Sequence, residues 1–398
     1  MSISIDVPVS NRASMVFLGL TAVTFLAASS APTPLYRLYQ ENMQFSAATL
    51  TLIFGVYALS LLTALLTVGS LSDYLGRRPV IFCALILDML AMGLFLCADS
   101  VTWLIAARLL QGFATGMATS VLGAAMLDND RQQGPLINSI SPLVGMACGA
   151  LGTSVLVEFA PQPLHLAYWV LLGALAIQAL YVWRLPESMS PQPGALASLR
   201  PSLHIPPQAR AAMWSVLPVN IAVWAMGGFY LALVPSLIRA ATGSTSYLVG
   251  GGVVAVLTLS GALAIFSMRN QSAARVLTLG SSLLVVGVST IMLAVHTASL
   301  GLFFFGSLLA GCGFGSGFLG SVRSVVPLAL PHERAGLMSA FYVLSYLAFC
   351  LPVLLVGSLT RIFGLVVTAD GFSVVLIVLA LGALFVLLLR RIATPSKA

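Results

Sequence analysis

Two ionisable side chains lie inside long apolar stretches of the sequence. Arg108 lies in one of them and is followed by Gln111, and Asp88 lies near the middle of the stretch before it. A charge at the centre of a bilayer costs about 2.5 to 3.5 kcal/mol on insertion scales, so such residues usually face a protein interior and serve function. We interpret Arg108 as a cation that couples proton movement or holds an anionic group. The alternative is an arginine that snorkels to the membrane surface.

Asp88 has two interpretations that the residues alone leave open. Because it is acidic and lies well inside an apolar stretch, it is a candidate for ion coupling. It is equally a candidate for a structural ion pair with Arg108.

A short charged segment, residues 69–79, separates two apolar runs and must lie outside the hydrocarbon. Its defining residues are Gly69, Asp73, Gly76, Arg77 and Arg78. Asp73 is placed to pair with Arg77, or to face the N-terminus of a later helix near Ala335, whose dipole favours an anion. We interpret the segment as a latch that closes one side of the protein, which Asp128 is positioned to join. The alternative is a topological anchor that carries arginines.

The composition excludes a soluble domain. The chain is 59% hydrophobic and 7% charged, with a mean hydropathy of +1.03, whereas soluble domains carry roughly 25% charged residues. Its 398 residues have room for about twelve spans of roughly 20 residues each. We attribute the net charge of +7 to loop arginines that face lipid headgroups, not to a nucleic-acid partner.

The apolar stretches predict an all-α membrane protein with twelve transmembrane helices. Lipid offers the backbone no hydrogen-bond partner, and the runs do not alternate in hydrophobicity as barrel strands do. The expected spans are 14–35, 47–68, 80–98, 102–126, 136–158, 166–184, 211–238, 247–267, 276–296, 299–322, 336–358 and 370–389.

The basic residues predict the orientation. With the N-terminus inside, the external segments hold only Arg37, Arg239 and Arg361. The cytoplasmic segments hold Arg12, Arg77, Arg78, Arg131, Arg184, Arg200, Arg210, Arg269, Arg275, Arg323, Arg334, Arg390, Arg391 and Lys397. This bias predicts that both termini lie in the cytoplasm, which requires an even number of spans.

The chain divides into two halves. Residues 185–210 are rich in proline and read as a cytoplasmic linker between a first half, 1–184, and a second half, 211–398. Residues 109–116 align with residues 308–315, which indicates an internal repeat.

Two motifs carry a resemblance to a known family. The pattern G-x-L-x-D-x-x-G-R-R from Gly69 to Arg78 resembles the loop between the second and third helices of the major facilitator superfamily, and R-x-x-Q-G at 108–112 resembles its fourth-helix motif. The resemblance implies two pseudo-symmetric six-helix halves that rock around a central site near the midplane. It also implies that the 69–79 loop is a conformational latch.

Other parts of the sequence resemble the family less closely. Pro142, Gly145, Gly149 and Gly152 in the fifth span only loosely resemble an antiporter motif and are explained by close helix packing. The first span lacks the acidic residue that many drug/proton antiporters of the family carry there.

The resemblance also implies which residues meet the substrate, because the first, fourth, seventh and tenth helices usually line the cavity in this family. The eleventh span adds two tyrosines that lie on one helix face. The candidates for substrate contact are Tyr36, Asn220, Trp224, Tyr230, Tyr342 and Tyr346. The alternative is that these side chains face lipid or the membrane interface.

No catalytic chemistry is indicated. P-loop, HExxH and GxSxG motifs do not occur. The cysteines, Cys83, Cys97, Cys148, Cys312 and Cys350, are odd in number and form no CxxC pair. We therefore expect no catalytic residue, no cofactor and no metal site.

The sequence predicts a secondary active transporter of a bacterial inner membrane that exports a drug-like or metabolic small molecule, coupled to protons, as a monomer. Two alternatives transport differently: a proton-coupled importer of a sugar or organic acid, and a facilitator without coupling. The third alternative is a receptor or scaffold that does not transport.

Overall fold

The computed structural model describes residues 12–201, 203–330 and 333–393, with side chains as far as residue 389. The described residues form α-helices joined by short turns, and they contain no β-strand. Twelve helical segments within them are long and apolar enough to cross a membrane. The predicted all-α membrane fold is confirmed.

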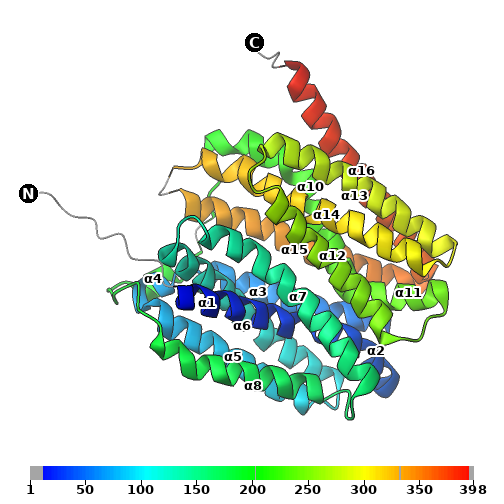
Figure 1. Ribbon diagram of the computed structural model, residues 1–398, viewed down its shortest axis with the longest axis horizontal. Helices are drawn as coiled ribbons and strands as arrows, with labels where there is room; N and C mark the ends of the chain where they lie inside the picture. Colours follow the sequence, from blue (N-terminus) through cyan, green and yellow to red (C-terminus); the bar gives the residue numbers. More distant parts are fainter. Residues whose placement is uncertain (1–11, 202, 331–332, 394–398) are drawn as a thin grey trace, which may run out of the picture.

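The helices form two groups in space (Figure 1). The first helix group comprises α1 (Arg12–Ser30), α2 (Pro32–Met43), α3 (Ala47–Thr67), α4 (Ser72–Leu75), α5 (Arg77–Leu96), α6 (Val101–Asn129), α7 (Gly134–Phe159) and α8 (Leu166–Tyr181). The second helix group comprises α10 (Pro207–Ala232), α11 (Val234–Thr242), α12 (Tyr247–Ser267), α13 (Ala273–His296), α14 (Leu300–Val325), α15 (Arg334–Phe363) and α16 (Leu365–Ala393). The groups meet where α3 packs on α15 and α7 packs on α12.

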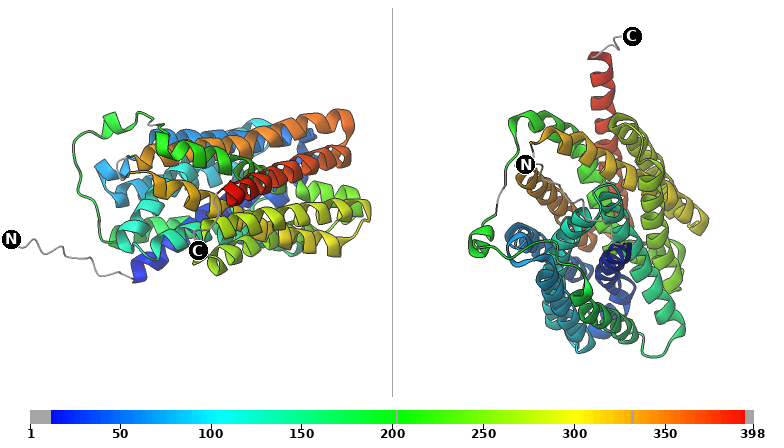
Figure 2. Two further views of the ribbon diagram at one scale, coloured as in Figure 1. Left: turned by 90° about the horizontal axis from the view of Figure 1, so that it is seen from above. Right: turned by 60° about the vertical axis from the view of Figure 1, so that its left-hand side comes forward.

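The two ends of the bundle differ in what they carry. One end, called the linker end here, carries α4 and the segment between the groups, which includes the short helix α9 (Ala195–Ser198) (Figures 1 and 2). The opposite end, called the far end, carries α2 and α11 (Figure 1). The predicted positions of the two termini fall on residues 1–11 and 394–398, outside the described residues.

The first and seventh spans are broken helices. The first breaks at Ala31, before Pro32, and resumes as α2; the seventh breaks at Leu233, before Pro235, and resumes as α11. Proline lacks an amide hydrogen and cannot continue the hydrogen-bond ladder, which explains both breaks. The first predicted span therefore ends too early, at residue 35, since its helical segment continues to Met43. The seventh, predicted to end at residue 238, has its long apolar helix end at Ala232, and α11 continues to Thr242.

The internal repeat extends to the helix boundaries. Helix α6 begins at Val101 and α14 at Leu300, and α8 begins at Leu166 and α16 at Leu365. These pairs keep the offset that aligns 109–116 with 308–315. The broken first helix recurs in each group as well, so the two groups have the same plan.

Helices α3 and α6 approach closely at two glycines of α6, Gly112 and Gly116. A side chain at Gly112 would overlap the backbone carbonyl of Tyr57 on α3. The absence of a Cβ allows the two backbones to approach, as small residues do in packed membrane helices. This contact holds the Tyr57 ring over the side chain of Arg108, one turn away on α6.

Candidate functional site

Arg108 is buried in the interior of the first helix group. Only 1% of its surface is exposed, so it does not snorkel outward. Its Nε donates to the hydroxyl of Tyr36 at 2.9 Å, and Nη2 donates to the same hydroxyl. Its Nη1 donates to the backbone carbonyl of Ser29 at 2.8 Å and to Oε1 of Gln111 at 2.7 Å. Every one of these acceptors is neutral.

Aromatic rings enclose the same guanidinium. Its central carbon lies 5.4 Å from the ring centre of Tyr36, 5.1 Å from that of Tyr57 and 5.9 Å from that of Phe95. A cation over an aromatic face gains about 0.5 to 2 kcal/mol, with the larger values when it is desolvated. The rings come from α2, α3 and α5, so the cation connects four helices.

The break between α1 and α2 supplies acceptors for this cluster. In a continuous helix the carbonyl of Ala28 would accept from the residue four positions on, which is Pro32 and has no amide hydrogen. The side-chain amide of Gln111 donates to this carbonyl instead, at 2.9 Å. The helix break therefore fixes Gln111, which in turn accepts from Arg108.

Asp88 lies on α5 and is completely buried. Neither of its carboxyl oxygens has a hydrogen-bond partner among the described residues. Arg108 acts on it electrostatically, but no ion pair joins the two side chains. The alternative of a structural Asp88–Arg108 ion pair is wrong for this structure, because neutral acceptors occupy the guanidinium.

The loop cluster, residues 69–79, is held together at the linker end by Arg77. Its Nη1 lies 2.5 Å from Oδ1 of Asp73, and its Nε lies 2.9 Å from Oδ2 of Asp128 at the end of α6. Nη1 also donates to the hydroxyl of Ser72 at 2.6 Å. Of the two predicted partners for Asp73, the structure has Arg77 and not the N-terminus of α15.

Glu187 caps the helix that follows the loop cluster. Its carboxylate accepts from the backbone amides of Arg77 and Arg78, at 2.7 and 3.0 Å. These are the first amides of α5, where a helix has free donors and a positive dipole end. Gly76 adopts a φ of +95°, and a Cβ there would come within 2.9 Å of the Glu187 carboxylate. The turn therefore requires glycine, and the cap requires the linker.

The rest of the linker also binds the loop cluster. The backbone amide of Gln192 donates to the carbonyl of Tyr74 at 2.9 Å, and its side chain donates to the carbonyl of Asp73 at 2.8 Å. The hydroxyl of Ser188 donates to Asp128 at 2.9 Å. Glu187 was not among the functional residues expected from the sequence. It could have been noticed as an acidic residue in a proline-rich segment, because the chain has only 11 acidic residues.

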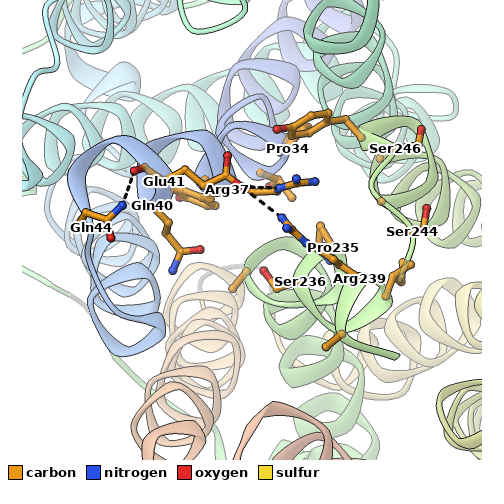
Figure 3. A pocket seen from close by; sticks show the side chains of 18 residues that line it. Pro34, Arg37, Gln40, Glu41, Gln44, Pro235, Ser236, Arg239, Ser244 and Ser246 are labelled. Carbon is orange, nitrogen blue, oxygen red and sulfur yellow. Dashed lines mark hydrogen bonds and ion pairs between the residues drawn. The ribbon is translucent and has the colours of Figure 1, made fainter. Parts of the chain in front are cut away.

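A cavity of about 560 Å³ opens at the far end between the two helix groups (Figure 3). One wall is α2, with Tyr36, Arg37 and Glu41, and the other is α11 with the start of α12. Glu41 accepts from Arg37 at 2.9 Å and from Arg239 at 3.2 Å. Arg37 also donates to the carbonyl of Thr245 at 3.0 Å. The far-end ion pairs, Arg37–Glu41–Arg239, thus join the groups across the cavity.

The candidate substrate contacts are distributed unevenly. Tyr36 lines the far-end cavity, and the other candidates are not among its lining residues. Asn220 donates to Ser345 at 2.9 Å, and the hydroxyls of Tyr230 and Ser307 are 2.8 Å apart. The remaining three, Trp224, Tyr342 and Tyr346, lie in a cluster of aromatic rings. Their role as substrate contacts stays a prediction.

Residues 17–351 match the family model of the Major Facilitator Superfamily. This match covers most of the chain. The chain belongs to the major facilitator superfamily. Membership places it among membrane transporters and not among enzymes, as predicted.

Curated relatives of this superfamily member cover only part of it. The multidrug resistance protein MdtL of Escherichia coli (strain HS) is 28% identical over 160 residues, which are 39% of this chain and 40% of that protein. MdtL of Shigella flexneri matches to the same extent. The chain thus spans about two-fifths of the length of these relatives.

Solved structures share the fold over nearly the whole chain. A bacterial homologue of the human lysosomal transporter Spinster, in an inward-facing state, aligns with a TM-score of 0.75 and 14% identity, covering 97% of this chain and 98% of that one. The nucleoside transporter NupG aligns with a TM-score of 0.71 and 13% identity over 94% and 98%. The human organic anion transporter MFSD10 aligns with 0.69 and 19% over 94% and 99%. At these identities the likeness shows the fold alone.

Proposed function

We propose that this transporter exports a drug-like or metabolic small molecule in exchange for protons, by alternating access. The observation that carries the proposal is a separated pair of buried ionisable groups. Asp88 is fully buried with both oxygens unpaired, and Arg108 is bonded only to neutral acceptors. A carboxyl group that gains and loses a proton during a transport cycle must not be held in one charge state by a permanent ion pair.

Asp88 is the proposed proton-binding group. A buried carboxylate without hydrogen bonds is costly, whereas the neutral acid is tolerated, so Asp88 carries a proton in this conformation. Arg108 is the cation available to it once the proton leaves. Deprotonation would draw the guanidinium away from Tyr36, and Tyr36 lines the far-end cavity. Proton release is thereby linked to a change at the entrance between the helix groups. Gln111 keeps Arg108 oriented in both states.

The two ends of the bundle supply the proposed gates. At the far end, Glu41 on α2 and Arg239 on α11 join the two helix groups, so opening there must break this contact. At the linker end the loop cluster, with Gly69, Asp73, Gly76, Arg77 and Arg78 as its defining residues, acts as the latch, held by Asp128 and Glu187. Alternating access requires that only one gate is open at a time.

The direction of transport rests on the curated relatives. MdtL is named a multidrug resistance protein, which supports export of a toxic or waste compound. With this direction we place the chain in the inner membrane of a bacterium as a monomer, with both termini and the linker end in the cytoplasm. The excess of arginine at the linker end supports this orientation.

The experiment compares three proteins at equal expression in a bacterial host stripped of its own efflux pumps. Wild type, Asp88→Asn and the control Asp99→Asn, an exposed residue just beyond α5, are tested against a panel of toxic compounds. We expect resistance from wild type and Asp99→Asn, and none from Asp88→Asn. Resistance that survives Asp88→Asn would contradict proton coupling at this residue.

A second candidate is import of an organic acid. The observation that favours it is the absence of an acidic partner for Arg108 among the described residues, since a substrate carboxylate would supply one. An inward pH gradient would then accelerate uptake of a carboxylate into whole cells, and Arg108→Gln would abolish that uptake. An uptake rate that does not change with the pH gradient would instead indicate a facilitator.

A further inference from the structure

Six aromatic side chains form a cluster in the second helix group, called the aromatic cluster here. Its members are Trp224 of α10, Phe318 of α14, and Phe341, Tyr342, Tyr346 and Phe349 of α15. The Trp224 ring centre lies 4.9 Å from that of Tyr346, 6.1 Å from that of Phe349 and 6.2 Å from that of Phe318. The indole is therefore the hub of the cluster.

The aromatic cluster faces the first helix group and not lipid. The ring of Phe349 lies 5.0 Å from that of Phe54 on α3. The next residue, Cys350, directs its sulfur to the carbonyl of Gly55 at 3.6 Å. On the other side, Phe318 packs against a small hydrophobic cluster that joins Leu143 of α7 to Ala262 and Ile265 of α12. The cluster thus lies at the interface between the two groups, where a substrate must pass in alternating access.

The polar atoms of the aromatic cluster are not satisfied by the protein. In the described part of the chain, the hydroxyls of Tyr342 and Tyr346 and the indole N–H of Trp224 make no hydrogen bond, and none of the three atoms is sealed from solvent. By contrast Tyr230, on the same helix as Trp224, is buried and its hydroxyl is paired with that of Ser307. Half-buried aromatic residues with three free donors are the expected lining of a ligand site.

The charges nearby restrict which ligand fits. The aromatic cluster contains no ionisable acid or base other than phenol. Arg108 of the first helix group is 1% exposed and covered by the ring of Tyr57. An anionic ligand would lose its hydration at the cluster without gaining an opposite charge. A cationic ligand would also lose its hydration, and the aromatic faces would return only a small part of that cost. An uncharged, flat ligand gains ring stacking and accepts hydrogen bonds from the free donors.

We propose that the aromatic cluster is the substrate site of this transporter and that it takes an uncharged planar aromatic molecule with hydrogen-bond acceptors. Trp224 and Tyr346 supply the stacking surface. Tyr342, Tyr346 and the indole N–H donate to carbonyl oxygens or ring nitrogens of the ligand. This inference deepens the proposed function, since it names the class of substrate that the exporter would carry.

Binding to purified protein in lipid nanodiscs tests the site, with empty nanodiscs as the blank. The probe is flavone, a neutral planar ketone; the charged comparisons are the cation ethidium and the anion anthracene-9-carboxylate. We expect Trp224→Ala to weaken flavone binding about tenfold or more and Tyr346→Phe, which keeps the ring, about threefold. The control Trp214→Ala changes an exposed tryptophan of the same helix and should leave the affinity unchanged.

Two results would overturn the inference. One is flavone affinity that is equal in wild type and Trp224→Ala, with both proteins folded by thermal melting. The other is tighter binding of ethidium or of anthracene-9-carboxylate than of flavone. Transport of flavone into inverted membrane vesicles is measured separately. Binding that depends on Trp224 without any transport would contradict the proposed export and support the site, whereas transport that ignores Trp224 would contradict the site.

Discussion

Equivalent positions of the two helix groups carry opposite chemistry. By the offset of the repeat, Ser307 of α14 is the residue equivalent to Arg108 of α6. Gly287 of α13 is the residue equivalent to Asp88 of α5. At this position each of the two helices, α6 and α14, forms a hydrogen bond with a tyrosine of the broken span that begins its own group. Arg108 bonds to Tyr36, and Ser307 to Tyr230.

The comparison shows that the fold does not need a charge at this place. In the second group the hydroxyls of Tyr230 and Ser307, 2.8 Å apart, form a neutral hydrogen bond at this position. Helix α13 packs directly on α14 there, with Gly287 against Ala310. The first group accepts a buried cation and a buried acid although both are costly in a membrane. This difference supports the proposed role of the charges in coupling and of the aromatic residues of the second group in recognition.

The largest expected effect comes from removing the charge in the first group. Arg108→Gln removes the cation but keeps a polar side chain, and we expect transport to fall about 100-fold or more, as for loss of a charge that acts in the cycle. Its matched variant Ser307→Ala should stay within about twofold of wild type, because a neutral hydrogen bond is worth about 1 kcal/mol or less here. Initial transport rates in vesicles at equal protein content measure both. Equal losses in the two variants would contradict the comparison.

A smaller effect is expected from the tyrosines that serve the two positions. Tyr36→Phe removes the hydroxyl that accepts twice from Arg108. We expect about a tenfold loss of transport, since a hydrogen bond to a charged group is worth about 1.5 to 3 kcal/mol. Tyr230→Phe should change thermal stability more than transport, because its partner Ser307 is neutral. If Tyr230→Phe slows transport as much as Tyr36→Phe, the two tyrosines have the same role.

The smallest effect is expected at the loops of the linker end, which also differ between the groups. In the first group Arg77, together with Glu187 of the linker, holds the loop. In the second group Arg323 donates to the carbonyls of Arg269 and Gln271. Glu187→Gln should slow transport about two- to fivefold, equivalent to about 0.5 to 1 kcal/mol for a partly exposed contact.

The matched variant at these loops is Arg323→Gln. It should leave the transport rate within error and lower only the melting temperature, because its bonds remain within the second group. Rates measured at low and high salt check the ionic origin of the Glu187 effect, which salt should reduce. A Glu187→Gln variant that is indistinguishable from wild type at low salt would remove Glu187 from the latch.

The sequence could predict the features that rest on local pattern. Apolar length predicted the twelve spans, and the motif around Asp73 and Arg77 indicated their contact. Each of these depends on residues close in the chain.

The sequence could not predict contacts that depend on how distant segments meet. Glu187 caps α5 from more than one hundred residues away, and Glu41 meets Arg239 only because α2 and α11 lie at one end. The Asp88–Arg108 ion pair, one of the two interpretations that the sequence left open, is absent for a related reason. The backbone carbonyls of Ser29 and Ala28, next to the helix break, are neutral acceptors that hold Arg108 and Gln111.

The protonation state of Asp88 tests the central claim most directly, and it requires no substrate. Infrared difference spectra of wild type and Asp88→Asn in lipid, recorded at neutral pH, show whether the residue contributes the C=O stretch of a protonated acid or the bands of a carboxylate. The account predicts a protonated-acid band in wild type that is absent from Asp88→Asn and unchanged by the control Asp99→Asn. Carboxylate bands from Asp88 at neutral pH would contradict it, because a permanently ionised Asp88 cannot bind the coupling proton.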